Sequence, residues 1–428
     1  MNRTAFINAR LVDPASGLDT PGNLLAADGK IADLGSNLFS DGIPDGVEVV
    51  DCRGQVLAPG LIDMRVFTGE PGAEHRETLR TASHAAAAGG VTTFIVMPNT
   101  DPVIDDVALV DFIERRARDT GIVNIHPMAA LTKGLNGKQM TEIGLLKDAG
   151  AVAFTDGDRA IADAQVMRRA MSYAAHFGAL LVQHAEVPEL ATGVMNEGEL
   201  ASRLGLAGIS PAAETIMIER DLRLLELTGG RYHVAQISCE ASVDVIRRAR
   251  RHGLKVTCGV SAAHLTLNEN DVQGYRTFFK LSPPLRSEGD RRALVAGLAD
   301  GTIDVVVSSH DPQDPEVKRR PFAQAGFGAI GLETLLSAAL SLVQNGDMPL
   351  ARLLSAMTHV PADLLGLDTG RLAAGLPADL VLIDIGSPWI VEADKLHSIS
   401  KNTTFDNRRM QGRALRTVVG GKTVYVQG

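Results

Sequence analysis

The feature that most constrains the fold is a regular alternation of apolar runs and helical patterns through the middle of the chain. Eight strand-like runs end near Ile62, Met97, Ala130, Thr155, His184, Ile237, Gly259 and Ser308. Helical patterns separate most of them, at 74–88, 107–120, 138–149, 163–177, 212–228, 241–252 and 291–300. Eight strands that alternate with helices are typical of a TIM (β/α)8 barrel, an α/β fold, rather than of an open doubly wound sheet.

Short strand-like segments lie near both ends of the chain. They fall at 4–12, 23–27 and 47–51, and again at 378–385 and 413–426. The last segment reads as a hairpin around Val419-Gly-Gly-Lys422. Because none of these segments buries a core alone, we expect one small β-sandwich domain built from residues 1–54 and 369–428. The barrel would then occupy residues 55–368.

Composition excludes several classes of function. The net charge of −9 and the lack of a dense Lys/Arg stripe argue against a nucleic-acid surface. The three cysteines are an odd number without CxxC spacing, which favours a reducing compartment. No signal-peptide pattern is present, and no apolar run reaches the about 20 residues that a membrane span needs. We therefore expect a cytoplasmic protein that binds neither nucleic acid nor membrane.

The first barrel strand ends in an unusual way. An apolar run over 56–62 reads as one buried strand that stops at Asp63 and opens into a turn rich in glycine and proline. In barrels of this kind, functional groups lie at the C-terminal ends of strands. Many metal-dependent hydrolases carry two histidines, one residue apart, at such a strand end. This chain has Arg65 and Phe67 there.

Several stretches carry a resemblance to a known family. They are LAPGLID, AAAGGVTTFIVMPNTDPVID, LTKG, AGAVAFTDG, GVMNEGE, VTCGVSAAHL, SPPLR and IGLET. In this order they resemble the bacterial dihydroorotases of the amidohydrolase superfamily, over nearly the whole chain. The resemblance implies a role in pyrimidine biosynthesis. The family opens the dihydropyrimidine ring by amide hydrolysis, with divalent metal ions that polarise the carbonyl and activate water.

Four of the six metal positions that the family uses are lost. The histidine pair of the first strand falls on Arg65 and Phe67, and the sixth-strand histidine falls on Gln236. The eighth-strand aspartate, which is also the general base, falls on Ser309. We expect Gln236 and Ser309 to belong to a hydrogen-bonded polar network, and no catalytic residue remains in the pattern.

Two metal positions are retained. The fourth-strand carboxylate is Asp156, and the fifth-strand histidine is His184. A zinc site needs at least three protein ligands, and only His310 or Asp311 could add to this pair. No two histidines lie two, three or four residues apart. We therefore expect no metal cofactor. In that case His184 is a relict ligand that is hydrogen-bonded inside the pocket. The alternative is that His184 is a true metal ligand beside Asp156.

The substrate anchor is also altered. The arginine with which the family binds the substrate carboxylate falls on Gly69, whereas its asparagine partner is retained as Asn99. We expect the Arg65 guanidinium to fill the vacated metal site and pair with Asp156, because a buried carboxylate without a partner is costly. The alternative is an Arg65 that points to solvent. Phe67 would fill the remaining space with apolar bulk.

Three functions from different classes follow. The first is a catalytically inactive dihydroorotase homologue that serves as a structural partner of aspartate transcarbamoylase, a partner implied by the resemblance, in a homo- or hetero-oligomer. The second is an active dihydroorotase or related cyclic amidohydrolase, with zinc in a rearranged site made by Asp156, His184 and the 309–314 loop. The third is a metal-free binder of a small pyrimidine-like ligand through Asn99. Metal content and turnover of dihydroorotate separate the first two.

Overall fold

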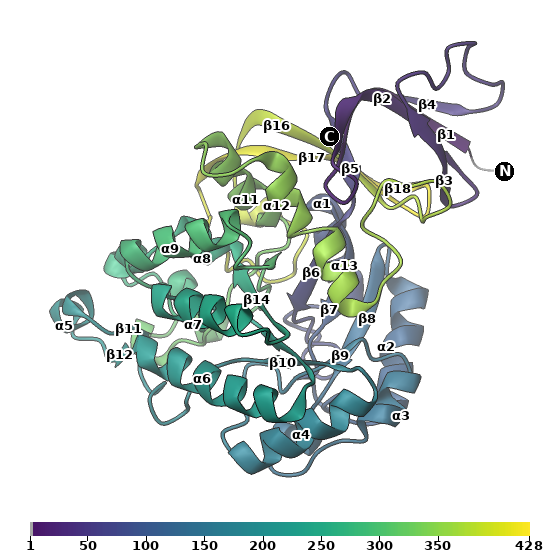
Figure 1. The fold of residues 1–428 in the computed structure, drawn as a ribbon. Helices are drawn as coiled ribbons and strands as arrows, with labels where there is room; N and C mark the ends of the chain where they lie inside the picture. Colours follow the sequence, from purple (N-terminus) through teal and green to yellow (C-terminus); the bar gives the residue numbers. More distant parts are fainter. Residues whose placement is uncertain (1–2) are drawn as a thin grey trace.

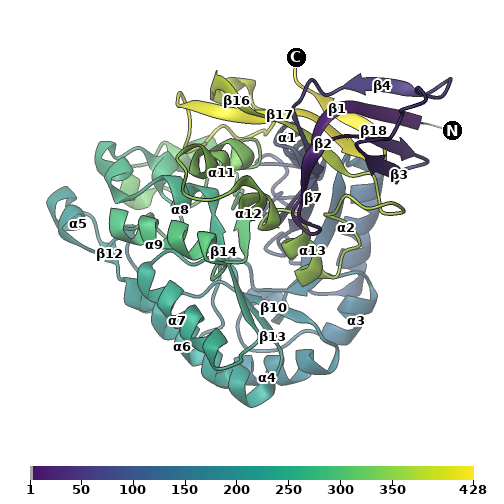
Figure 2. The same cartoon turned by 45° about the horizontal axis from the view of Figure 1, so that its top comes forward.

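The computed structural model describes residues 3–428, and its larger part is a parallel barrel (Figures 1 and 2). Neighbouring barrel strands are parallel, and the bridge between Val66 and His310 joins the first strand to the segment after the last. In barrel order the strands are β6 (Leu61–Val66), β7 (Val91–Val96), β8 (Asn124–Ala129), β9 (Ala153–Phe154), β10 (Leu180–Gln183), β13 (Arg231–Val234), β14 (Val256–Ser261) and β15 (Val305–Val307). The expected TIM barrel is confirmed.

Helices surround this barrel. Their bounds are α1 (Leu79–Ala88), α2 (Val107–Thr120), α3 (Ile143–Asp148), α4 (Ala164–His176), α6 (Pro211–Thr228), α7 (Glu240–Arg251), α9 (Glu288–Ala299), α11 (Leu335–Gln344), α12 (Leu350–Ser355) and α13 (His359–Leu365). Short elements in the loops are β11 (Met195–Asn196), α5 (Glu199–Leu204), β12 (Gly208–Ile209), α8 (Ala262–Thr266) and α10 (Pro315–Lys318). None of the helices within residues 3–428 combines the length and apolar character that crossing a membrane requires.

The first helix begins later than its sequence pattern indicates. The pattern predicts a helix from residue 74, but α1 begins at Leu79. Thr78 forms a capping box with Thr81, in which each side chain satisfies the other's backbone N–H. Such a box fixes a helix start, so residues 69–77 remain a loop. This loop carries Arg76 and Glu77 to the mouth of the barrel.

Both chain ends build a second sheet beside the barrel (Figures 1 and 2). Its order is β18-β17-β16-β5-β1-β2-β3, and β4 pairs with β1. The strands are β1 (Arg3–Asp13), β2 (Leu18–Ala27), β3 (Lys30–Gly35), β4 (Glu48–Asp51), β5 (Val56–Pro59), β16 (Leu380–Ile390), β17 (Arg409–Val419) and β18 (Lys422–Val426). Most neighbours are antiparallel, and the sheet packs on its own small core, which includes Phe6, Leu24, Ile31, Leu57 and Leu380.

The apolar run at 56–62 is two strands, so the single strand expected there is wrong. Residues up to Pro59 pair with β16 in the terminal sheet, whereas Leu61 begins the barrel strand β6. Gly60 lies between them, and a Cβ on it would come within 2.1 Å of the Thr92 hydroxyl oxygen. Only glycine allows the chain to pass from one sheet to the other this close to β7.

The barrel interior is apolar below its mouth. Ile62, Ile95, Met128, Val182 and Val305 belong to one buried cluster inside the strands. Interiors packed in this way leave no room for solvent. Polar groups that face a cavity are therefore confined to the C-terminal ends of the strands and to the loops above them.

Candidate functional site

A cavity of about 940 Å³ lies at the C-terminal mouth of the barrel. Among the residues that the sequence singles out, its walls include Arg65, Phe67, Asn99, His184, Ser309 and His310. Asp156 and Gln236 do not line it. The structure therefore brings six of the eight predicted residues to one cavity.

Asp156 is bound to the neighbouring loop. One carboxylate oxygen accepts the backbone N–H groups of Leu131, at 3.0 Å, and Thr132, at 2.8 Å, and the other accepts the Thr132 hydroxyl. Burial raises the pKa of Asp156, and these three hydrogen bonds act in the opposite direction. The carboxylate thus fastens the turn that follows β8.

The expected pair between Arg65 and Asp156 does not form. The Arg65 guanidinium donates one long hydrogen bond, 3.4 Å, to the carbonyl oxygen of Gly157. Burial lowers the pKa of Arg65, whereas the charges of Asp158, Asp311 and Asp63 raise it from a distance. The prediction fails because Asp156 finds all its partners on its own side of the mouth.

His184 belongs to a polar cluster on the opposite side. Its Nε2 lies 2.9 Å from one carboxylate oxygen of Glu186, and the Ser282 hydroxyl lies 3.2 Å from both. Burial opposes ionisation of Glu186, but the hydrogen bond and charge of His184 outweigh it, so the pKa of Glu186 is lowered. Gln236 donates to the Ser282 carbonyl oxygen at 3.4 Å, but its own side-chain oxygen is buried without a partner within residues 3–428, so the expected network is only partly formed.

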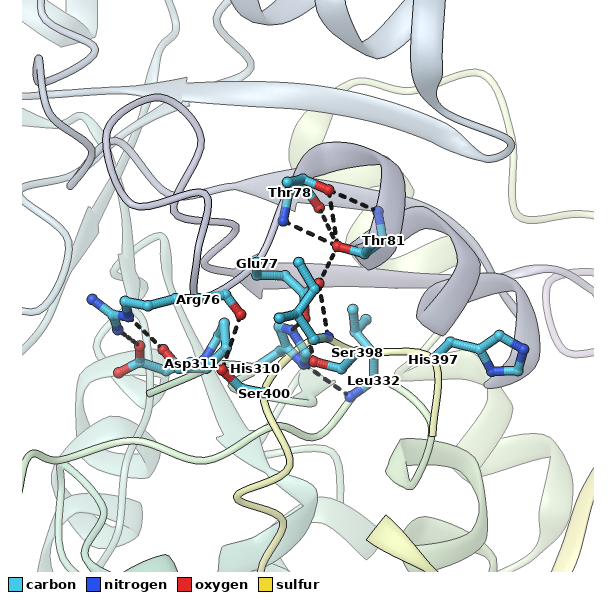
Figure 3. A network of polar contacts seen from close by, with 12 residues as sticks. Arg76, Glu77, Thr78, Thr81, His310, Asp311, Leu332, His397, Ser398 and Ser400 are labelled. Carbon is cyan, nitrogen blue, oxygen red and sulfur yellow. Dashed lines mark hydrogen bonds and ion pairs between the residues drawn. The ribbon is translucent and has the colours of Figure 1, made fainter. Parts of the chain in front are cut away.

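His310 belongs to a network of polar contacts around Glu77 (Figure 3). Its Nδ1 accepts the backbone N–H of Gly331 at 3.2 Å, so its proton is on Nε2, which lies 3.5 Å from the Glu77 carboxylate. Glu77 is fully buried and also accepts the hydroxyls of Thr81 and Ser398. Burial opposes the ionisation of Glu77, but His310 and, to a smaller extent, the two hydroxyls prevail and lower its pKa.

Phe67 and Asp311 share Arg76 as a partner. The Arg76 guanidinium lies 4.6 Å from the centre of the Phe67 ring and donates to Asp311 at 3.0 Å. Burial raises the pKa of Asp311 to about 6, although the charge of Arg76 acts against this. The Arg76 guanidinium thus covers the Phe67 ring, which stands where the family has a histidine. Phe67 lines the cavity of about 940 Å³ and does not fill it, contrary to the expectation from the sequence.

Comparisons with known proteins agree with this architecture. The profile of the Dihydro-orotase-like family matches residues 54–242, and that of an amidohydrolase family matches 338–425. A protein of Ehrlichia chaffeensis called dihydroorotase is 42% identical over 98% of this chain and 94% of its own length. One of Citrifermentans bemidjiense, also called dihydroorotase, is 43% identical over 97% of this chain and 98% of its own. The chain belongs to the dihydroorotase family.

Solved structures of other proteins have the same fold. The L-hydantoinase of Arthrobacter aurescens superposes with a TM-score of 0.91 at 27% identity, covering 100% of this chain and 97% of that one. The dihydropyrimidinase of Brevibacillus agri, 21% identical with a TM-score of 0.86, shows the fold alone. The barrel with an attached terminal sheet is therefore shared with cyclic amide hydrolases.

The donor atoms of this dihydroorotase-family chain do not fit a zinc site. Within residues 3–428, no group of three or more His, Cys, Asp or Glu side chains is placed to hold a metal ion. Asp156 is engaged by Leu131 and Thr132, and His184 by Glu186 and Ser282. A tetrahedral site needs three protein donors that converge on one point.

Sequence reasoning missed two residues of the mouth. Glu186 follows His184 by two positions in VQHAE, and this acidic residue beside a strand-end histidine was a usable signal. Glu77 gave no such signal. It becomes part of the site through His310 and through Ser398, the latter 321 residues away along the chain.

Proposed function

We propose that this dihydroorotase-like protein of de novo pyrimidine biosynthesis is non-catalytic and acts as a structural partner of aspartate transcarbamoylase. One observation carries the first half of the proposal: the two ligand-type residues that remain, Asp156 and His184, each hold a structural partner of their own. The aspartate transcarbamoylase partnership follows from the family resemblance.

The chemistry of amide hydrolysis supports the same proposal. An unstrained amide needs an activated water, a polarised carbonyl and a group that relays protons to the leaving nitrogen. The position of the family base holds the hydroxyl of Ser309, whose ordinary pKa is far too high for a general base. Arg65 is a permanent cation and does not take a proton from water. Neither residue can therefore relay protons to the leaving nitrogen.

A second candidate is a working cyclic amide hydrolase. The relatives' name supports it, and so does Asp311, which lines the cavity and has a pKa raised to about 6. A carboxylate with such a pKa suits a general base near neutral pH. In this alternative, Asp311 would take the role that the family gives to the residue at position 309.

Metal content and turnover decide between the two. Protein purified without chelator is analysed for zinc and then assayed with dihydroorotate, with and without added zinc. We expect far less than one metal per chain and no turnover above the blank. About one zinc per chain together with turnover that Asp311→Asn abolishes would contradict the proposal.

The partner is tested by co-expression. The tagged chain is produced with the aspartate transcarbamoylase of the same organism and passed through affinity and size-exclusion columns. We expect one complex of constant stoichiometry that persists at about 0.3 M salt, where long-range surface attraction is largely screened. Separate elution of the two proteins at micromolar concentration would contradict the partnership.

A further inference from the structure

The Arg65 guanidinium is a cation with unused hydrogen-bonding capacity. It has five N–H donors, of which one makes a 3.4 Å bond to Gly157, and it forms no ion pair with a carboxylate of residues 3–428. The other arginine at this side, Arg76, is already engaged by Asp311 and the Pro312 carbonyl oxygen. Arg65 lines the cavity and is thus the one of this pair with donors to spare for an anionic group.

Glu186 presents the opposite charge with one oxygen unused. Its Oε2 is taken by His184 and Ser282, whereas its Oε1 is buried and has no hydrogen-bond partner within residues 3–428. The side chain is 9% exposed and lines the same cavity. Buried polar atoms in native proteins are nearly always satisfied, so a lone carboxylate oxygen indicates a missing donor.

The two groups face each other across the barrel. Arg65 lies on β6, the first of the eight strands, and Glu186 follows β10, the fifth. First and fifth strands lie on opposite walls of an eight-stranded barrel, and both residues line the cavity above its packed interior. Asn99 adds a second buried oxygen without a partner within residues 3–428, and it lies beside Gly157, which Arg65 contacts.

We propose that the cavity binds a free amino acid as a zwitterion, with its carboxylate at Arg65 and its ammonium group at Glu186. This binding needs no metal and no hydrolysis, so it goes beyond the structural role proposed above. A guanidinium on one wall and a carboxylate on the other select a molecule that carries both charges.

Binding is measured on the full-length protein by thermal shift and isothermal titration. Each of the twenty amino acids is tested first, and the tightest is then compared with its analogue that lacks the ammonium group, such as glutarate for L-glutamate. We expect one amino acid to bind at one per chain, and its analogue to bind at least tenfold more weakly. No binding by any amino acid, or an equal affinity of the analogue, would overturn the proposal.

Matched variants assign the two ends of the ligand. Arg65→Met and Glu186→Gln should each weaken binding at least tenfold, and Arg65→Lys should retain part of it because the charge remains. Arg118→Met and Asp119→Asn remove the same charges from exposed residues of α2 that do not line the cavity, and should change affinity less than twofold. Arg65→Met removes a desolvated cation without an ion pair, so folding is expected to survive. Tighter binding of dihydroorotate than of every amino acid, insensitive to Glu186→Gln, would overturn the assignment.

Discussion

The β9–β10 side of the barrel mouth retains the side chains that the family uses as ligands, whereas the β6–β15 side has replaced them. On the first side, Asp156 and His184 are present but bonded to Thr132 and Glu186. On the second side, Arg65 stands in the place of a ligand and has a single weak partner. Ligand-type residues therefore do not by themselves define a metal site. At least three donors that converge on one point do, and no such group is found within residues 3–428.

One of the two largest effects is expected on the β6–β15 side, at Glu77. Glu77→Ala should destabilise the fold by about 4 kcal/mol, because it removes the buried carboxylate beside His310 and the acceptor of the Thr81 and Ser398 hydroxyls. The measurement is urea unfolding followed by circular dichroism. The pKa of Glu77 is lowered in the fold, so its contribution is present above its unfolded pKa and is lost as the pH falls. Glu77→Gln, which keeps the shape, should cost less; an equal cost would contradict the hydrogen-bond account.

On the β9–β10 side, Asp156 tests whether a retained ligand type serves structure. Asp156→Ala should cost about 4 kcal/mol, because two N–H groups and the Thr132 hydroxyl lose their acceptor. Asp158→Ala is the control, since this exposed neighbour should change stability by less than about 0.5 kcal/mol. If Asp156→Ala instead left stability unchanged and removed a bound metal, the two sides of the mouth would not differ as described.

Asp63, on the β6 side of the mouth, tests the comparison through the pH dependence of the stability. It is fully buried below Arg65, and burial raises its pKa from 3.8 to about 6. The folded state therefore binds more protons than the unfolded state in this range, and stability falls as the pH rises from about 4 to 6, by up to about 3 kcal/mol. Asp63→Asn should flatten this part of the stability profile measured by thermal unfolding. An unchanged slope would show that another group titrates.

The smallest effect concerns Phe67. Phe67→Leu keeps an apolar side chain but removes the face on which Arg76 lies, and should cost about 1 kcal/mol. The variant should keep the hydrogen bond between Arg76 and Asp311. Stability measurements on Phe67→Leu, on Arg76→Met and on the variant with both changes complete a double-mutant cycle, which isolates the contact between the ring and the guanidinium. Additive losses would mean that Phe67 contributes packing alone.

Much of the mouth followed from the sequence because the barrel strands end within a few residues of their apolar runs; β6, for example, continues from Ile62 to Val66. Arg65, Phe67, Asn99, His184, Ser309 and His310 reach one cavity as strand ends predict. The pairing between Arg65 and Asp156 did not follow. Facing strand ends bring two charges near each other, but the nearer donors of the loop after β8 take the carboxylate first.

By itself, the sequence determined the barrel and the loss of the histidine pair, since periodicity and residue identity are local properties of the chain. Only the tertiary structure decided which partner each polar side chain has. Ser282 meets His184 across 98 residues, and Ser398 meets Glu77 across 321. A hydrogen bond requires donor and acceptor within about 3 Å and in line, a condition set by the packing of whole elements. For that reason, the residues at the mouth could be identified from the sequence, whereas their hydrogen-bond partners could be identified only from the fold.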